Sequence, residues 1–269
     1  MPFRGKRSNR PKSTKPRSTF KSNKAKIAKP SKPLKNYIKK IVHGNMENKV
    51  WIDYGVNQTL TTLSGSPASN TAATLYLLPK PSVNVGHSGR IGNEIRIRRA
   101  YIYGRVNLLP YNLTNNPLST PILVKMWLVS FKTINTALIN SCTSTANYFE
   151  TGTGSVSFQG NVLDTVLSPN KDVLTVHKTK SFELGATYAS SGGAVGTAGY
   201  FDNSKMTMPF YFSFGNKFRA ALKYNDNATN VAENRNCWLI TQVVNADGSS
   251  TAVTAAEMHY NLRVEYEDA

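Results

Sequence analysis

The sequence predicts an all-β protein: a single eight-stranded jelly-roll sandwich with a disordered basic N-terminal arm. Eight segments rich in β-branched and aromatic residues follow residue 48, and none has the spacing of a long helix. Residues 1–40 hold fifteen Lys or Arg and no acid, whereas the remaining 229 residues hold eighteen basic and fifteen acidic side chains. We therefore expect two parts, a basic arm over residues 1–40 and a nearly neutral jelly-roll domain over residues 41–269.

The arm is expected to be disordered when free and to bind nucleic acid without regard to sequence. Residues 1–32 contain almost no aliphatic side chains, so burial cannot offset the entropy lost on ordering. Solubility does not require so long a run of one charge, and nuclear import requires only a few basic residues, which leaves import as a second use of the same segment. The predicted phosphate-contacting residues are Arg4, Lys6, Arg7, Arg10, Lys12, Lys15, Arg17, Lys21, Lys24, Lys26, Lys29, Lys32, Lys35, Lys39 and Lys40.

Counterion release would drive this binding, because each phosphate that is neutralised frees condensed cations. On a single strand the slope of log K against log salt is about −0.7 for each contact, so fifteen contacts would give roughly −10. The arm offers only Phe3, Phe20 and Tyr37 as stacking surfaces, so base stacking by the arm should be minor.

The end of the arm has the spacing of a short helix. Within residues 33–42, Leu34, Tyr37, Ile38 and Ile41 recur at intervals of three and four, and a proline stands at the expected first turn. We expect one or two helical turns, which form only when docked because a free helix of this length is marginal.

The eight expected strands are bounded by Gly, Ser, Asn and Pro clusters, and the last of them alternates most clearly. Leu262, Val264 and Tyr266 alternate with polar residues, which is typical of a strand with one buried face. The segments are residues 49–56, 74–79, 94–110, 122–132, 172–184, 208–224, 237–244 and 258–267.

The third of these segments changes phase along its length. Ile95 and Ile97 set one apolar face, but the apolar face from Ala100 to Leu108 falls on the other parity. One extra residue would reconcile the two halves, so we predict a β-bulge near Arg98–Arg99.

The fourth segment, residues 122–132, is apolar on both faces apart from Lys125 and Ser130. This pattern predicts an interior strand covered on both sides, or a strand with one face in a subunit interface.

Two long connections, roughly residues 140–170 and 185–205, are rich in Ser, Thr, Gly and Asn and carry few charges. We expect them to be loops that make subunit contacts or form an outer surface.

No spacing of residues points to catalysis, a metal or another cofactor. The histidines, His43, His87, His177 and His259, are scattered, and the glycine clusters complete neither a dinucleotide nor a phosphate-loop pattern. The absence of a G-x-S-x-G elbow leaves no support for a hydrolase triad. We expect no enzyme activity.

The cysteine spacing and the hydropathy of the chain predict neither a metal site nor a membrane span. Cys142 and Cys237 have no metal-ligand spacing and are expected to be reduced thiols, although a single disulfide between them stays open. No apolar run is long enough for a membrane span, and the N-terminus has no apolar core of a signal peptide, so membrane insertion is not expected.

The segment SGRIGNEIRIRRAYIYGRVNL, residues 88–108, resembles an early strand in capsid proteins of circular, Rep-encoding single-stranded DNA viruses. The arm is similar to theirs only in composition, and it is rich in lysine where circoviruses favour arginine, so the resemblance is to a circovirus-like group. The residues that carry the match are Gly89, Arg90, Ile91, Gly92, Asn93 and Ile95. Later segments that resemble strands of the family are residues 169–184, 217–224, 237–244 and 260–269.

The resemblance implies a capsid protein that self-associates into a small T=1 icosahedral shell around a circular single-stranded DNA genome. About 60 arms would bring on the order of 900 positive charges inside the shell. It further implies a location in the virion, and in the host nucleus during assembly, with the import machinery as a partner. Possible additional genome-facing residues are Arg96, Arg98, Arg99 and Arg105, which would otherwise form a solvent-facing surface or meet acidic neighbours.

Three alternatives stay open. A small RNA virus also needs a capsid, and phosphate attraction does not distinguish RNA from DNA. A cellular nucleic-acid-binding protein would be a monomer or dimer, and an enzyme of the cupin type would hold a metal.

Overall fold

The computed structural model describes ten stretches of the chain, and its contacts divide the chain into two units, Met1–Gly44 and Asn45–Ala269. In the first unit it describes a helix over 32–37 with Pro33 in its first turn, which confirms that part of the predicted helix; residues 38–42 lie outside the described residues. None of the described helices is long and apolar enough to cross a membrane. The described stretches are residues 31–37, 47–62, 74–84, 86–109, 121–132, 147–152, 154–188, 201–225, 231–248 and 252–268.

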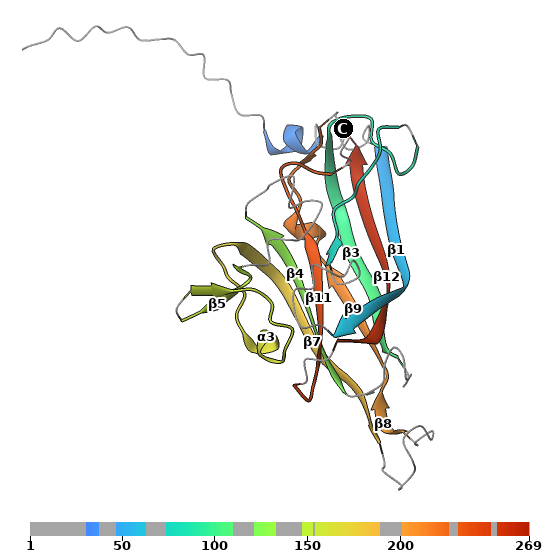
Figure 1. Ribbon diagram of the computed structural model, residues 1–269. Coiled ribbons are helices and arrows are strands. Elements are labelled where there is room, and N and C mark those ends of the chain that lie inside the picture. The colour runs from blue at the N-terminus through green and yellow to red at the C-terminus, as the bar shows by residue number, and fades with distance from the viewer. Residues whose placement is uncertain are drawn as a thin grey trace, which may run out of the picture. The chain divides into compact units, whose positions relative to one another are not determined.

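The second unit is built around two antiparallel sheets (Figure 1). In one sheet, called the β1 sheet, the order is β1-β12-β3-β10, and β9 also pairs with β3. In the other, called the β2 sheet, the order is β2-β11-β4-β7-β8. The strands of the β1 sheet are β1 (Glu47–Thr62), β12 (Val253–Asp268), β3 (Glu94–Leu108), β9 (Thr207–Ser213) and β10 (Leu222–Lys223). Those of the β2 sheet are β2 (Thr74–Tyr76), β11 (Trp238–Asn245), β4 (Ile122–Phe131), β7 (Leu174–Tyr188) and β8 (Phe201–Lys205).

The chain passes repeatedly from one sheet to the other. Strands β1, β2, β3 and β4 alternate between the sheets, and β12 returns to lie between β1 and β3. This arrangement confirms the predicted all-β, jelly-roll-like sandwich. Each of the eight predicted segments contains a strand of one sheet. The prediction of one strand over residues 208–224 is wrong, because the turn η3 (Gly215–Lys217) separates β9 from β10 there. Within the described residues, β5, β6 and β8 are short additions to the predicted strands.

The core lies between the two sheets and is filled by the alternate residues of each strand. Leu262, Val264 and Tyr266 of β12 are at most 1% exposed, which confirms the predicted alternation of that segment. Ile102 of β3 and Met126 of β4 belong to the same continuous cluster from the two layers. Burial of this apolar area is the main stabilising contribution to such a sandwich.

The predicted β-bulge in β3 is confirmed, and Arg98 is the extra residue. Arg99 pairs with Glu265 of β12, but the next pair joins Ile97 to Tyr266, so two residues of β3 face one of β12. Buried positions therefore change parity at this point of the strand.

Strand β4 is an interior strand, between β11 and β7, and both of its faces are covered, as predicted. Its Trp127 is fully buried on the side away from the core. The ring of Trp127 lies 5.8 Å from that of Tyr148, 6.0 Å from that of Phe149 and 5.8 Å from that of Phe158. Lys125 donates a hydrogen bond to the backbone carbonyl of Thr165.

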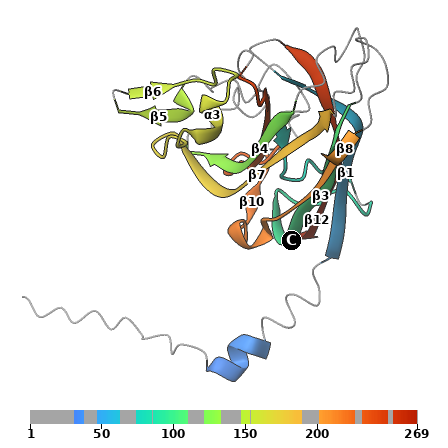
Figure 2. The same ribbon diagram turned by 90° about the horizontal axis from the view of Figure 1, so that it is seen from below.

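The prediction of a loop over residues 140–170 is wrong for the described part. This part contains β5 (Phe149–Thr151), β6 (Gly154–Val156) and α3 (Leu163–Val166), which lie beside β4 and β7 (Figure 2). The rings of Tyr148, Phe149 and Phe158 pack against Trp127 and hold the segment on the sheet. The polar composition of the segment did not indicate this packing. Residues 140–146 lie outside the described residues.

The prediction of a loop over residues 185–205 is also wrong at both of its ends. Strands β7 and β8 continue into it as an antiparallel pair, with Gly185 opposite Lys205 and Tyr188 opposite Phe201. Residues 189–200 lie outside the described residues.

Asp164 of α3 fixes this outer segment to β11. Its side chain is fully buried, and Oδ2 accepts hydrogen bonds from the backbone N–H groups of Gln159 at 2.8 Å and Gly160 at 2.7 Å. Gln242 of β11 donates to the same oxygen at 2.5 Å. Burial raises the pKa of Asp164, although these hydrogen bonds oppose the shift.

His177 joins β7 to the turn η3 (Gly215–Lys217). Its Nε2 lies 2.8 Å from the Ser130 hydroxyl, which donates its own proton to the carbonyl of Asn236. The hydroxyl therefore accepts a hydrogen bond from Nε2–H. The imidazole ring also packs edge-on against Phe218 at 5.7 Å.

We predict that stability falls between pH 7 and pH 5 because of His177. Burial, and secondarily the charge of Lys217, lower the pKa of this histidine, so the folded chain binds the proton more weakly than the unfolded chain. The contribution of the neutral ring is present above the unfolded pKa of about 6.5 and is lost as pH falls through the lowered folded value.

Chemical denaturation at the two pH values measures this effect. The variant His177→Gln should lose less stability on acidification than the wild type, and the exposed control His87→Gln should behave as the wild type does. An unchanged loss in His177→Gln would contradict the assignment.

Candidate nucleic-acid interface

The structure describes only two of the fifteen predicted arm contacts. Lys32 and Lys35 are exposed on the helix over 32–37, where Leu34 and Tyr37 are also 48% and 63% exposed. The other thirteen basic residues lie outside the described residues, so their contact with phosphate stays a prediction.

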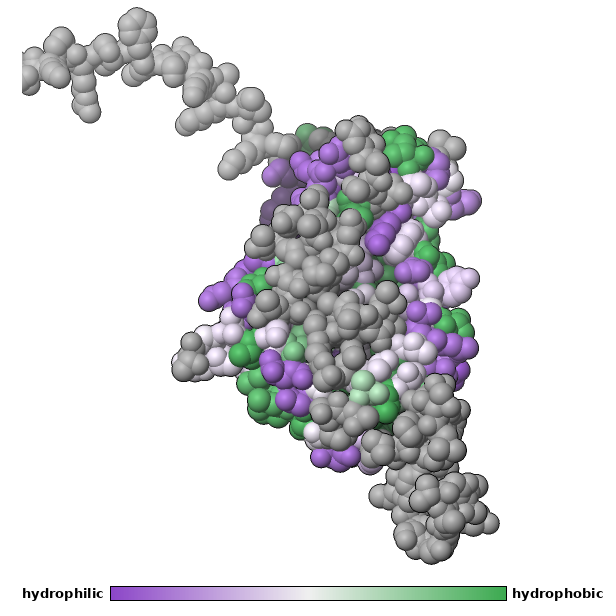
Figure 3. Space-filling model, viewed as in Figure 1, coloured by the Kyte–Doolittle hydropathy of each residue, from purple (hydrophilic) through white to green (hydrophobic). Residues whose placement is uncertain are grey.

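The outer face of the β1 sheet, the side turned away from the core, gathers the other predicted residues. Arg96, Arg98, Arg99 and Arg105 are all exposed there, because β3 alternates and then changes parity at its bulge. The space-filling view shows hydrophilic and hydrophobic residues interleaved on the side of the body where β1 lies (Figure 3).

The four arginines differ in their partners. Arg98 Nε lies 3.4 Å from Glu267 Oε1, and its Nη1 donates to Asn48 Oδ1 at 2.8 Å, so Arg98 meets acidic and polar neighbours within the fold. For Arg96, Arg99 and Arg105, no carboxylate of the described residues lies within ion-pair distance. These three guanidinium groups keep their charge available to a ligand.

Three of the four acidic side chains of β3 and β12 on this face pair with Lys or Arg. The fourth, Glu257, accepts a hydrogen bond from His259 Nε2, while the other ring nitrogen of His259 accepts the backbone N–H of Asn57. Glu265 lies opposite Arg99 in the register, but its carboxylate pairs with Arg263 instead. The face therefore keeps a positive excess. The pairs and their distances are Glu94–Lys223 at 3.3 Å, Glu257–His259 at 3.1 Å, Glu265–Arg263 at 3.3 Å and Glu267–Arg98 at 3.4 Å.

The sequence pattern points to stacking residues only in the arm, whereas the structure places tyrosines among the arginines. Tyr103 of β3 lies directly opposite Tyr211 of β9, and they are 46% and 59% exposed. The ring of Tyr101 lies 6.1 Å from each of them. Tyr54 of β1, 71% exposed, occupies the same cross-strand row through Asn261.

The signal that could have revealed these tyrosines is the predicted bulge. Once the parity changes at Arg98, Tyr101 and Tyr103 must point outward with Arg99 and Arg105. Tyr211 could not be placed from the sequence, because its register on β3 is a tertiary pairing.

A cleft of about 440 Å³ lies at one end of this row, beside the bulge. Gly215 forms part of its wall, and a Cβ at that position would lie 2.6 Å from the backbone nitrogen of Ala100. Only glycine lets the turn η3 approach β3 so closely. The lining residues are Arg98, Arg99, Ala100, Tyr101, Tyr211, Ser213, Gly215 and Asn216.

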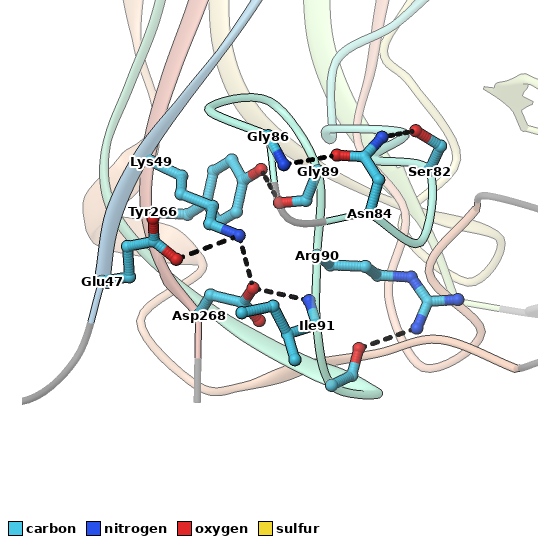
Figure 4. A network of polar contacts seen from close by, with 11 residues as sticks. Glu47, Lys49, Ser82, Asn84, Gly86, Gly89, Arg90, Ile91, Tyr266 and Asp268 are labelled. Atoms are coloured by element: carbon cyan, nitrogen blue, oxygen red, sulfur yellow. Dashed lines mark hydrogen bonds and ion pairs between the residues drawn. The ribbon is translucent and has the colours of Figure 1, made fainter.

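A buried ion pair joins the first and last strands near this face (Figure 4). Lys49 Nζ of β1 lies 3.0 Å from Asp268 Oδ2 of β12 and 3.3 Å from Glu47 Oε2. The Lys49 side chain is fully buried, whereas that of Glu47 is 51% exposed. The same Asp268 oxygen accepts the backbone N–H of Ile91 at 2.6 Å.

The motif that carries the sequence resemblance is structural. Arg90 is 1% exposed, and its Nη1 donates to the carbonyl of Gly92 at 2.7 Å and to Asn93 Oδ1 at 2.9 Å. The guanidinium group lies 5.1 Å from the centre of the Tyr224 ring, and Tyr266 donates to the carbonyl of Gly89 at 2.7 Å (Figure 4). These contacts hold the segment before β3 in place and leave Arg90 no ligand-binding surface.

Residues with potential for other chemistry are dispersed. In the part of the chain that the structure describes, no three His, Cys, Asp or Glu side chains form a group that could hold a metal. Cys237 is a buried free thiol, and burial raises its pKa. Cys142 and His43 lie outside the described residues.

Comparison with known proteins adds two weak likenesses. The sequence matches no family model and no curated protein. A solved structure of Desmodium yellow mottle tymovirus is 12% identical, with a TM-score of 0.30 over 83% of this chain and 87% of that one. A cryo-EM structure of Mud crab tombus-like virus is 9% identical, with a TM-score of 0.25 over 85% of this chain and 96% of that one. At TM-scores this low, the fold assignment depends on the strand order of this chain alone.

We predict that Lys49→Met lowers the free energy of unfolding by about 3 kcal/mol, because it leaves Asp268 buried without its cation. This value is at the low end for a broken buried pair, since the exposed Glu47 keeps the cluster close to water. Urea unfolding measures the loss. The control Lys223→Ala breaks an exposed pair with Glu94 and should cost less than about 1 kcal/mol; equal losses would refute the role of the buried pair.

Proposed function

We propose that this protein is a viral capsid subunit that packages a single-stranded nucleic acid genome through its N-terminal arm. The observation that carries the proposal is the separation of charge. An arm with fifteen positive charges and no negative ones precedes a nearly neutral, jelly-roll-like β domain. The role is structural rather than catalytic.

The physical advantage of this design comes from assembly. One arm binds phosphates weakly and without sequence preference, because counterion release depends only on charge. About 60 subunits would concentrate on the order of 900 positive charges in one enclosed volume, which neutralises a large part of a small genome. Effective concentration makes the assembled arms far stronger than the single one.

The edge of the β1 sheet supports self-association. Strand β1 is sixteen residues long and lies at the end of the sheet order, with β12 as its neighbour among the described residues. Ile52 and Val56 on it are 53% and 59% exposed. A long edge strand with exposed apolar side chains is a hazard in a monomer, and neighbouring subunits would cover it.

We propose a circular DNA genome, on the basis of the sequence resemblance in residues 88–108. The arm itself binds DNA and RNA alike, so an RNA genome is the alternative. With a DNA genome the protein would act in the virion and in the host nucleus, and the arm would also engage the import machinery.

We predict that deleting residues 1–40 abolishes packaging and leaves the β domain folded. Expressed full-length protein should form particles with a high ratio of absorbance at 260 nm to that at 280 nm, and the deletion should lower this ratio to that of protein alone. A matched variant that keeps the length but replaces the fifteen Lys and Arg by Gln should behave like the deletion. Unchanged nucleic-acid content in either variant would refute the role of the arm.

Negative-stain microscopy and nuclease digestion test the other parts of the proposal. Particles are expected, and a monomer or dimer without particles would indicate a cellular nucleic-acid-binding protein instead. Nucleic acid extracted from the particles should be digested by DNase; digestion by RNase alone would select the RNA-virus alternative.

We also predict a steep salt dependence for binding of the dispersed protein to a single-stranded oligonucleotide. If all fifteen charges engage, log K should fall with log salt at a slope of roughly −10. Fluorescence anisotropy over a salt series measures the slope, and a value near −2 would mean that most of the arm is not in contact.

A further inference from the structure

We infer that the outer face of the β1 sheet binds unpaired bases of single-stranded nucleic acid, in addition to the phosphates that the arm contacts. This inference rests on the proposed function, because it takes the packaged genome as the ligand. The site consists of a stacking strip, Arg99–Tyr101–Tyr103–Arg105 on β3, together with Tyr211 on β9.

The strip follows from the geometry of a strand. Residues two apart lie on the same face, so Arg99, Tyr101, Tyr103 and Arg105 form one line, about 20 Å long at the usual rise of a strand. Tyr211 lies opposite Tyr103 and widens the aromatic surface onto the next strand. Two cationic groups thus stand at the ends of a row of rings.

The rings are free to stack on a ligand. Tyr103 and Tyr211 are about half exposed, at 46% and 59%, although rings of this size are usually buried. The centres of Tyr101 and Tyr103 are 6.1 Å apart, wider than the roughly 3.4 Å rise of stacked bases. Separate bases, unstacked from each other, would therefore lie on separate rings, which single strands allow and duplexes do not.

The charges favour a polyanion over a second protein surface. Arg96, Arg99 and Arg105 have no carboxylate partner in the described residues, while three of the four acids on β3 and β12 of this face are paired with Lys or Arg. A second copy of the same face would carry the same positive excess and would be repelled. A phosphate backbone supplies the missing negative charges.

The cleft beside the bulge has the dimensions of a small-ligand site, at about 440 Å³. Its lining includes the cationic Arg99, the aromatic Tyr101 and Tyr211, and Asn216 with its side-chain amide. One nucleotide could place its base on the rings and its phosphate beside Arg99.

Anisotropy with two probes separates base stacking from phosphate attraction. Full-length dispersed protein is titrated with a thymidine oligonucleotide and with an abasic oligonucleotide of the same length, in salt high enough to weaken the arm. The wild type should bind the thymidine probe more tightly. The variant Tyr103→Ala/Tyr211→Ala should reduce this preference at least about fivefold, while Tyr103→Phe and the exposed α3 control Val166→Ala should keep it.

Photocrosslinking supplies a readout that needs no variant. A bromodeoxyuridine oligonucleotide should crosslink to Tyr101, Tyr103 or Tyr211, identified by mass spectrometry; crosslinks confined to residues 1–40 would overturn the inference. An unchanged preference for the thymidine probe in the double variant would also overturn the inference.

The proposal that the arm packages the genome and the inference that the β1 sheet binds bases can be refuted independently of each other. Loss of packaging on arm deletion is measured on particles, whereas base preference is measured on dispersed protein with defined probes. The inference is supported when the thymidine preference depends on the tyrosines, whatever nucleic acid the particles contain.

Discussion

One extra residue in β3 decides what the outer face of this protein presents to its surroundings. Because side chains alternate along a strand, an insertion of one residue exchanges the two faces. Before Arg98 the isoleucines of β3 point into the core, and after it Ala100 and Ile102 do so. The same step turns Tyr101 and Tyr103 outward. Without the bulge, one half of β3 would expose its apolar residues and bury its arginines, at a cost that the fold could not offset.

A second constraint holds this strand in register from its beginning. The buried cluster around Lys49 and Asp268 ties the start of β1 and the end of β12 to the backbone of Ile91, just before β3. Arg90 packs on Tyr224 and bonds to the loop beside it. Residues 88–108 carry the sequence resemblance to a viral capsid family. The start of this segment therefore has a structural role, because it positions β3, the strand that carries the exposed arginines.

The distribution of charge connects the fold with the proposed role. In the proposed role, long-range attraction belongs to the arm, whose fifteen positive charges are opposed by no acidic residue within it. The β domain presents a short, fixed set of rings and guanidinium groups on the outer face of the β1 sheet, where most acids of β3 and β12 are held in ion pairs such as Glu267–Arg98. Such a division would suit a capsid subunit: in the proposed role the arm binds the polyanion without sequence selection, and the sheet offers defined positions for a few nucleotides.

Much of this architecture could be predicted from local patterns. The spacing of apolar residues predicted the main strands. The change in the parity of the apolar residues along β3 predicted the bulge near Arg98, and the charge composition separated the arm from the β domain. Pairing between distant strands was decided only in the tertiary structure, because register depends on contacts that no local pattern encodes. That pairing placed Tyr211 beside Tyr103, joined Glu267 to Arg98 and packed three aromatic rings of a polar segment over Trp127. The sequence by itself determined which faces are apolar and where the charge lies; the tertiary structure decided which charges remain unpaired and which rings meet.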